Sequence, residues 1–276
     1  MKGTLYIVGT PIGNLSDISP RALTTLGECD FIAAEDTRVT IKLLNHFEIK
    51  KPLISYHEHN SRERSGEILE RLLEGQSCAL VCDAGMPLIS DPGEDLVKLC
   101  RKFGVVITVI PGPSAVISAL ALSGMSAGRF AFEGFLTTAK TNRKKHLRQL
   151  ENERRTMVFY EAPHKLASTL KDMLDHFGDR NISIVKEITK IHENVEYTTL
   201  KAAAEKYEAL KLKGEFVLIV EGAPEEIKDP PSLSSAVALA KRLSEDGLAM
   251  SEAAKKAAGQ TGVKKGDIYK ALVNGI

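Results

Sequence analysis

Short apolar runs alternate with helix-like segments along most of the chain, and this alternation constrains the fold more than any other feature. In the first half the runs lie at 4–9, 31–34, 53–56, 78–82 and 105–110, bounded by glycine, proline or polar residues as buried strands are. One intervening segment opens with Ser19 as N-cap and Pro20 as first helical residue, and residues 61–73 have helical period. This order predicts a mostly parallel sheet with helices on both faces.

The pattern restarts after Gly128, which predicts a second α/β domain. Further strands are expected at 130–135, 156–160, 182–185 and 215–220, with a basic helix that runs to about residue 155. We therefore predict an N-terminal α/β domain over residues 1–120 and a C-terminal α/β domain over 121–224. A linker at 224–231 and a small helical appendage at 232–276 would follow. The appendage is Ala-rich and breaks at 259–262, the outline of a helix-turn-helix or of a plain αα-hairpin.

Composition bounds the class of protein. The 276 residues are 43% hydrophobic and 26% charged, and no apolar run approaches the roughly 20 residues that cross a bilayer. We expect no membrane span and no signal peptide. Four cysteines (Cys29, Cys78, Cys82, Cys100) fit no zinc spacing and are expected to be reduced core residues of a cytoplasmic protein. The net charge of +1 hides basic stretches at 140–155 and 241–270, which are either phosphate-binding surfaces or solvated helix faces.

The loop Asp83–Gly93 directly follows an apolar run and is rich in Gly, Pro and Asp. Ligands of open parallel sheets bind outside the carboxyl ends of the strands. Comparable loops follow the first and fifth runs at 9–14 and 111–115, the latter at a helix N-terminus with free N–H groups. We expect these loops to form one ligand cleft.

Several kinds of site are disfavoured by the motifs. The chain has no Walker A sequence, dinucleotide fingerprint or nucleophile elbow. The pair His57-x-His59 could bind a metal, but no third ligand has diagnostic spacing, so no metal site is predicted. What remains is a cleft suited to a nonphosphorylated or zwitterionic ligand.

Ordered sequence blocks over residues 4–222 resemble the ribosomal RNA small-subunit methyltransferase I family of the tetrapyrrole-methylase superfamily. The blocks are VGTPIGNLSDI, AAEDTR, SYHEHN, DAGMPLISDPG, VIPGPSA, FEGF, FYEAPHKL, KEITKIHE and GEFVLIVEG. The resemblance implies two α/β domains with S-adenosylmethionine folded in the cleft between them. It implies 2′-O-methylation of a cytidine ribose in the decoding region of 16S ribosomal RNA, a small-subunit partner and a homodimer.

The resemblance also implies the cofactor contacts. They are Pro11 on the first loop, Ala84, Gly85 and Leu88 on the second, Ser114 and Ala115 on the third, and Tyr160, Glu161, Ile188 and Thr189 from the second domain. The corrin and porphyrin branch carries Gly-Asp-Pro in its second loop, where this chain has Ala84-Gly85-Met86-Pro87. Contacts there can differ by one residue. Asp83 and Asp91 then read as loop-shaping or cofactor-contacting residues.

A ribose hydroxyl is a poor nucleophile, so a base or a cation should assist it. The candidates are polar clusters at strand ends: Asp36 with Arg38, His57 with Glu58 and His59, and Lys186 with Glu187. We predict His57 or Asp36 as the base, and Arg38 or Lys186 as the group that orients phosphate or stabilises charge. The structural alternatives are a local Asp36–Arg38 ion pair and a satisfied polar strand end at the histidines.

The predicted RNA contacts are basic residues of the two basic stretches: Arg143, Lys144, Lys145, Arg148, Lys255, Lys256, Lys264 and Lys265. Two other functions stay open from sequence alone. One is methylation of a tetrapyrrole, another small molecule or a protein on the same fold, which would need neither basic stretch. The other is a ligand-sensing regulator whose appendage binds DNA.

Overall fold

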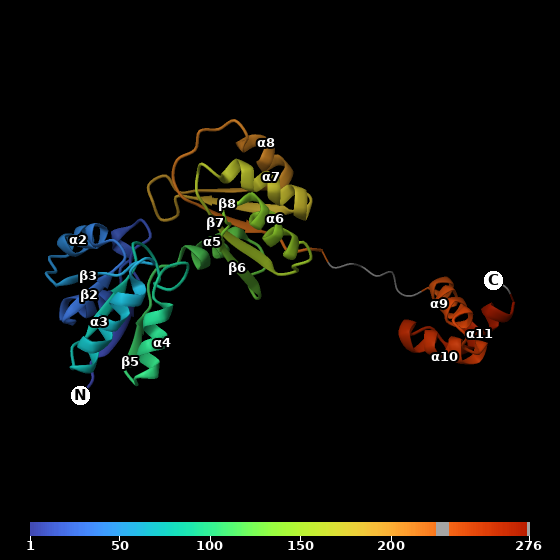
Figure 1. Ribbon diagram of the computed structural model, residues 1–276. Helices are drawn as coiled ribbons and strands as arrows, with labels where there is room; N and C mark the ends of the chain where they lie inside the picture. The colour runs from blue at the N-terminus through green and yellow to red at the C-terminus, as the bar shows by residue number, and fades with distance from the viewer. Residues whose placement is uncertain (225–231, 275–276) are drawn as a thin grey trace. The chain divides into compact units, whose positions relative to one another are not determined.

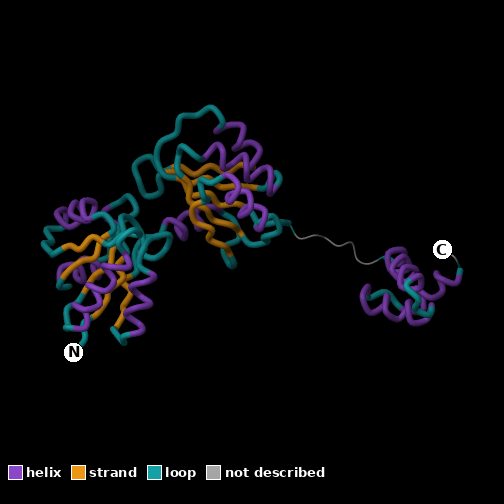
Figure 2. The backbone as a smooth tube through the Cα atoms, viewed as in Figure 1, coloured by secondary structure: helices purple, strands orange, loops and turns teal. Residues whose placement is uncertain are grey.

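The computed structural model describes residues 1–224 and 232–274. The chain divides into two compact units, Met1–Ala223 and Pro224–Ile276. Apart from Pro224, the linker predicted at 224–231 lies outside the described residues. Two five-stranded sheets with their helices make up the first unit, and helices make up the second (Figures 1 and 2).

The first sheet is parallel throughout and has the strand order β3-β2-β4-β1-β5. Its strands are β1 (Thr4–Val8), β2 (Phe31–Ala34), β3 (Leu53–Ser55), β4 (Cys78–Val81) and β5 (Val106–Ile110). One face, with Leu5 and Leu80, packs on α3 (Ser61–Leu73) and α4 (Glu94–Lys102). The other, with Val8 and Val81, packs on α1 (Pro20–Glu28) and α2 (Thr37–His46), and a 3-10 turn spans Leu15–Asp17. The predicted sheet with helices on both faces is confirmed.

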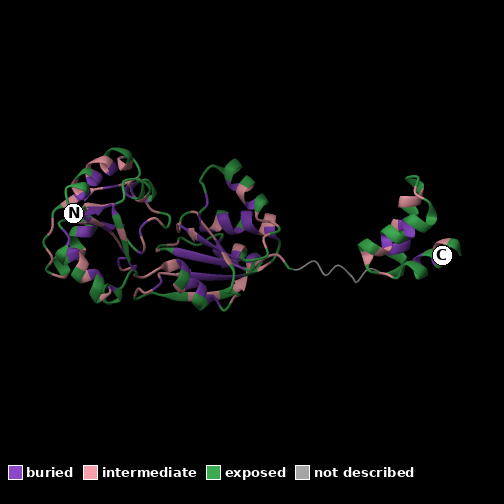
Figure 3. Cartoon of the chain, turned by 90° about the horizontal axis from the view of Figure 1, so that it is seen from below, coloured by how far each residue is buried: buried purple, intermediate pink, exposed green. Residues whose placement is uncertain are grey.

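The second sheet is mixed and has the order β6-β7-β10-β8-β9. Its strands are β6 (Phe130–Phe135), β7 (Thr156–Glu161), β8 (Asn181–Lys186), β9 (Asn194–Thr199) and β10 (Phe216–Val220). Only β6 and β7 pair in parallel. Helices α6 (Lys140–Gln149), α7 (Leu166–Phe177) and α8 (Leu200–Tyr207) follow strands of this sheet and pack on one face of it. The two-sheet α/β fold class is confirmed, and Figure 3 shows the buried strands of the second sheet.

Helix α5 (Ala115–Ser123) follows the last strand of the first sheet but packs on the second. Val116 and Leu120 lie in one buried cluster with Val185 and Val217. Helix α5 therefore belongs to the α/β domain built on the second sheet. We accordingly propose that the boundary between the two α/β domains lies in the loop 111–114, before this helix, rather than at residue 120.

The second unit contains α9 (Leu233–Glu245), α10 (Met250–Thr261) and α11 (Lys265–Val273) around a core rich in alanine. Gly262 ends α10 in the left-handed conformation, φ 71°, and a short turn leads into α11. This is the helix-turn-helix outline, with α9 packed against both helices. In the described parts of the chain, no helix is both long and apolar enough to cross a membrane.

The basic helix α6 ends at Gln149, earlier than the sequence predicts, and one of its predicted RNA contacts is buried. The Arg143 side chain is only 10% exposed, and its Nε donates to Asp172 on α7 at 2.7 Å. Arg143 was therefore wrongly assigned to the RNA-contacting set. Its partner lies 29 residues away in sequence, so no local pattern indicates the pair.

Replacing Arg143 with alanine should destabilise the protein by about 3–5 kcal/mol, because it leaves the Asp172 carboxylate buried without its partner. Lys145→Ala, on the exposed side of the same helix, should change stability by less than about 0.5 kcal/mol. Urea unfolding followed by circular dichroism compares the two. Equal stability of both variants would contradict the structural role of the pair.

Candidate functional site

Three loops meet at the carboxyl edge of the first sheet. The main chains of Thr10 and Gly85 exchange hydrogen bonds of 2.9 and 3.1 Å, which join the loops after β1 and β4. A Cβ on Gly9 would lie 2.6 Å from Sδ of Met86 and 2.7 Å from Cα of Gly112. Only glycine fits where the loops after β1, β4 and β5 touch. The three loops therefore lie together, and that they bind one ligand stays a prediction.

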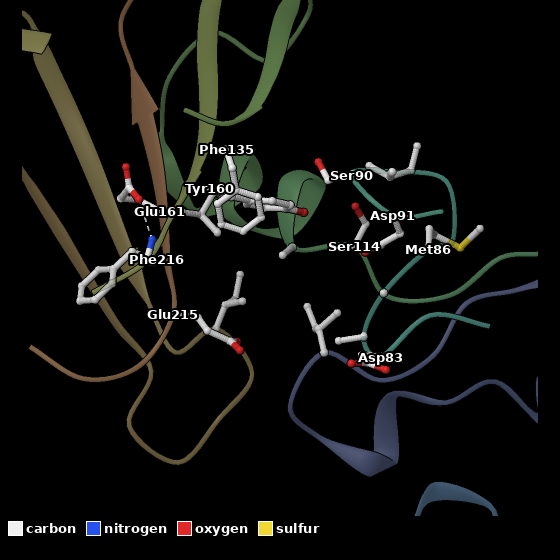
Figure 4. Close-up of a pocket in the computed structure, with 18 of the residues that line it drawn as sticks. Asp83, Met86, Ser90, Asp91, Ser114, Phe135, Tyr160, Glu161, Glu215 and Phe216 are labelled. Atoms are coloured by element: carbon white, nitrogen blue, oxygen red, sulfur yellow. Dashed lines mark hydrogen bonds between the residues drawn. The ribbon is translucent and has the colours of Figure 1, made fainter. Parts of the chain in front are cut away.

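A cavity of about 400 Å³ opens beside these loops, with a second wall from the other sheet (Figure 4). The first-sheet side is lined by Ile12, Glu35, Asp83, Ala84, Gly85, Met86, Ile89, Ser90 and Asp91. The side from α5 and the second sheet is lined by Ser114, Ala115, Phe135, Tyr160, Glu161, Ala162, Pro163, Ile188, Glu215, Phe216 and Val217. A cavity of this size holds a ligand as large as a nucleoside derivative.

Most residues predicted to bind the cofactor line this cavity: Ala84, Gly85, Ser114, Ala115, Tyr160, Glu161 and Ile188. The others lie elsewhere. Pro11 lines a neighbouring cavity with Thr40, and Leu88 packs against the first-sheet core. Thr189 follows Ile188 at the rim, with its hydroxyl buried against the loop that holds Gly13. Cofactor contact by any of these residues stays a prediction.

The first-sheet wall carries the carboxylates of Glu35, Asp83 and Asp91. Burial raises the pKa of Glu35, and the negative charge of Asp91 raises it further. Burial likewise raises the pKa of Asp83 and of Asp91. Glu35, Ser90 and Asp91 also line a second cavity, together with Glu58. Sequence reasoning missed Glu35, although it is the first polar residue after β2.

Asp36 is hydrogen-bonded to its own neighbour in the chain, Arg38. Its carboxylate accepts the N–H of Arg38 as the N-cap of α2, and it also accepts from the Arg38 guanidinium at 2.7–3.2 Å. These hydrogen bonds lower the pKa of Asp36 to about 2. Neither residue lines the main cavity. The pair is thus the local ion pair that the sequence left as an alternative.

His57 lies outside the lining of both cavities, whereas its neighbour Glu58 lines the second. The His57 ring nitrogen Nε2 is 3.3 Å from the Asn60 amide, and among the described residues its Nδ1 has no hydrogen-bond partner. The rings of His57 and His59 are 6.0 Å apart. Lys186 Nζ lies 6.0 Å from the ring of Phe216, a cavity residue.

The second-sheet wall combines aromatic and apolar side chains with two carboxylates, those of Glu161 and Glu215. The rings of Phe135 and Tyr160 pack at a tilt of 55° with their centroids 5.3 Å apart. Burial raises the pKa of Tyr160 to about 12, so its hydroxyl stays neutral. Glu161 is buried and accepts hydrogen bonds from the Ala162 N–H and the Thr169 hydroxyl. In Figure 4 these residues face Asp83, Met86 and Asp91 across the cavity. Residues 1–224 and 232–274 contain no group of three or more His, Cys, Asp or Glu arranged to hold a metal.

Sequence comparison identifies related proteins. Residues 4–204 match the family of tetrapyrrole (corrin/porphyrin) methylases. The chain is 45% identical over 271 residues to ribosomal RNA small subunit methyltransferase I of Halalkalibacterium halodurans, covering 97% of this chain and 94% of that protein. It is 50% identical to the protein of the same name from Thermotoga maritima over 220 residues, 80% of this chain and 99% of that protein. The Thermotoga relative therefore has no counterpart to about a fifth of this chain.

Solved structures share the fold at low sequence identity. Uroporphyrin-III C-methyltransferase from Thermus thermophilus, complexed with S-adenosyl homocysteine, has a TM-score of 0.57 and 18% identity over 79% of this chain and 97% of that chain. A diphthine synthase has a TM-score of 0.59 and 15% identity, covering 79% and 89%. These similarities concern the fold alone.

Proposed function

Because this chain belongs to the ribosomal RNA small subunit methyltransferase I family, within the tetrapyrrole methylases, we propose that it is an S-adenosylmethionine-dependent RNA methyltransferase. The proposed acceptor is the 2′-oxygen of a cytidine ribose in the decoding region of 16S ribosomal RNA. The cavity formed by loops of both sheets is the observation that carries this proposal. Membership in this family favours RNA over a tetrapyrrole, protein or other small-molecule acceptor, and favours an enzyme over a DNA-binding regulator.

The cavity fits the proposed cofactor chemically. The Asp83 and Asp91 carboxylates on the first-sheet wall would stabilise its sulfonium and ammonium charges. The N-terminus of α5, where Ser114 makes no side-chain capping bond, offers N–H groups to its carboxylate or hydroxyls. Apolar side chains such as Ile12, Ile188 and Val217 suit the adenine ring. When bound, the cofactor supplies a methyl group on positively charged sulfur.

The attacking hydroxyl must lose its proton, and a carboxylate with a raised pKa is the stronger acceptor. Glu35 has this property and lines both cavities, whereas Asp36, with a pKa of about 2, binds a proton too weakly. We therefore infer that Glu35 rather than Asp36 accepts the proton on its carboxylate, with His57 as the other candidate base. Arg38 and Lys186 remain the proposed cations that orient phosphate or stabilise charge.

Label transfer tests the function directly. Purified protein with methyl-labelled S-adenosylmethionine should transfer label to small ribosomal subunits or to 16S RNA. The labelled dinucleotide should resist alkaline hydrolysis, because a 2′-O-methyl group blocks cleavage of the adjacent phosphodiester bond. Label on a tetrapyrrole or on protein, with none on RNA, would contradict the proposal.

Replacing Glu35 with glutamine should lower kcat by about 10²–10⁴-fold with cofactor affinity nearly unchanged. A base acts only when deprotonated, so activity should rise with pH through a pKa above the usual glutamate range. Asp91→Asn removes a negative charge that raises this pKa, so the acid limb of the profile should move to lower pH. The negative charges of Asp83 and Asp36 also raise the pKa of Glu35, and both residues are kept in the Asp91→Asn variant. If E35Q keeps full activity while H57A loses it, the base is His57.

The exposed basic side chains are the proposed RNA contacts. Lys145 and Arg148 are exposed on α6, and Lys144 is half-buried there. Lys255, Lys256, Lys264 and Lys265 are exposed in the helical appendage. The Thermotoga relative lacks a counterpart to about a fifth of this chain, close to the share that the second unit contributes. We therefore assign the appendage to RNA affinity rather than to catalysis.

Replacing both Lys255 and Lys256 with alanine should weaken RNA binding and lower its salt dependence. Each lost phosphate contact should reduce the slope of log K against log salt by about 0.7–0.9. Cofactor affinity should not change. Alanine at Lys98 and Lys102, two exposed lysines of α4, is the matched control and should change neither quantity. Filter binding over a salt series makes the comparison, and identical slopes for the two double variants would contradict the assignment.

We also propose that the protein is a cytoplasmic homodimer. The small ribosomal subunit, its proposed substrate, is cytoplasmic, and the four cysteines are buried and unpaired, as suits a reducing compartment. Leu122 on α5 is exposed beside Tyr197 of the edge strand β9, whose hydroxyl donates to the Leu122 carbonyl at 2.7 Å. Exposed apolar and aromatic side chains at this edge suit a subunit interface. Light scattering on the purified protein measures the oligomeric state.

A further inference from the structure

The turn that follows β8 is strained. Glu187 and Thr189 both have left-handed backbones, with φ of 53° and 65°, which residues with a side chain rarely adopt. Such conformations persist only where surrounding contacts hold them, and they concentrate at ligand-binding sites. Ile188, between these two residues, is buried and lines the cavity. The strained backbone at Glu187 and Thr189 therefore positions Ile188 in the cavity wall.

Lys190 provides the contacts that hold the turn. Its Nζ donates to Oε1 of Glu187 and to Oε2 of Glu215, each at 2.9 Å. The Glu215 N–H donates to the same Glu187 oxygen at 2.9 Å, and the Glu187 N–H donates to the Glu215 carbonyl at 3.0 Å. The Lys190 side chain is only 29% exposed. One lysine thus ties the turn after β8 to the residue that precedes β10.

The turn also meets the first-sheet loop that carries Gly13. A Cβ on Gly13 would lie 2.5 Å from Cγ of Lys190 and 2.8 Å from Oγ1 of Thr189. One residue earlier in that loop, Ile12 lies in the same buried cluster as Ile188. Both isoleucines line the cavity, one from each sheet. The lysine stem and the loop are therefore packed with no room for another atom.

We propose that Lys190 is a positioning residue that fastens residues 187–190 against the loop 9–14, and thereby sets the distance between the two cavity walls. It touches no reacting atom and acts through Ile188 and Ile12 and through its partner Glu215, which also lines the cavity. This proposal rests on the proposed function only for the identity of the ligand, S-adenosylmethionine. A salt bridge that merely stabilised the second sheet would not couple to the first-sheet loop.

The first test needs no ligand. Hydrogen exchange on the full-length protein should show faster exchange in Lys190→Met at both 187–190 and 9–14. Lys206→Met is the matched control. Lys206 on α8 pairs with Glu196 of β9 at 2.7 Å, and neither residue lines the cavity. This variant should leave both segments unchanged. Faster exchange at 187–190 alone, with 9–14 protected as before, would overturn the coupling.

The second test is cofactor binding by calorimetry and steady-state kinetics. Lys190→Met should raise Kd and KM for S-adenosylmethionine about tenfold, because the cavity walls that carry Ile188 and Ile12 are no longer held in place, with kcat within about twofold. Lys190→Arg should restore most of the affinity, and Lys206→Met should not change it. A fall in kcat at unchanged Kd would overturn the positioning role.

Two controls keep the tests separable. If Lys190→Met is less stable, Glu187→Gln weakens the same ion pair with little change in size, and the double variant should be non-additive in Kd. Additive effects would count against the coupling. If the wild-type protein bound no S-adenosylmethionine, the proposed function would fail, while hydrogen exchange would still decide the role of Lys190.

Discussion

The site depends on one packing constraint, the close approach of three loops at the carboxyl edge of the first sheet. Gly9 and Gly112 leave no space for a side chain between the loops, and Thr10 and Gly85 join two of them by main-chain hydrogen bonds. The edge of the cavity is consequently built from backbone. Backbone groups recognise a ligand without side-chain freedom to lose, and side chains nearby are left to supply charge.

Both walls contribute charge and apolar surface to the cavity. The first-sheet wall carries Glu35, Asp83 and Asp91, and the second-sheet wall carries Phe135 and Tyr160 together with Glu161 and Glu215. A ligand that fills the cavity contacts both walls. The arrangement therefore requires the walls to be held at a fixed separation, and the packing of Gly13 against the turn at 187–190 meets that requirement.

The sequence predicted the parts whose signals are local. Apolar runs located the strands of the first sheet, and glycine and proline located its three loops. Strand β9 escaped prediction because it is a half-exposed edge strand without an apolar run. The buried Arg143 escaped because Asp172 is distant in the chain. The sequence did not single out Glu35 over Asp36 as the candidate base, because the difference depends on a helix cap. Asp36 is the N-cap of α2, so its carboxylate accepts a backbone N–H of that helix. The preceding residue, Glu35, lines the cavity instead.

An acidic cavity in an enzyme proposed to act on RNA imposes an orientation on its substrate. Carboxylates at the cavity repel phosphates within a Debye length, about 8 Å at physiological salt, whereas a ribose and its base are uncharged. The nucleotide should thus enter with its sugar toward Glu35 and with its phosphates directed away. Arg38, whose side chain is 86% exposed, is the cation beside Asp36 and offsets part of this repulsion. Under the proposed function, the net charge of +1 is compatible with RNA binding, because negative side chains lie at the cavity and positive ones on α6 and the helical appendage.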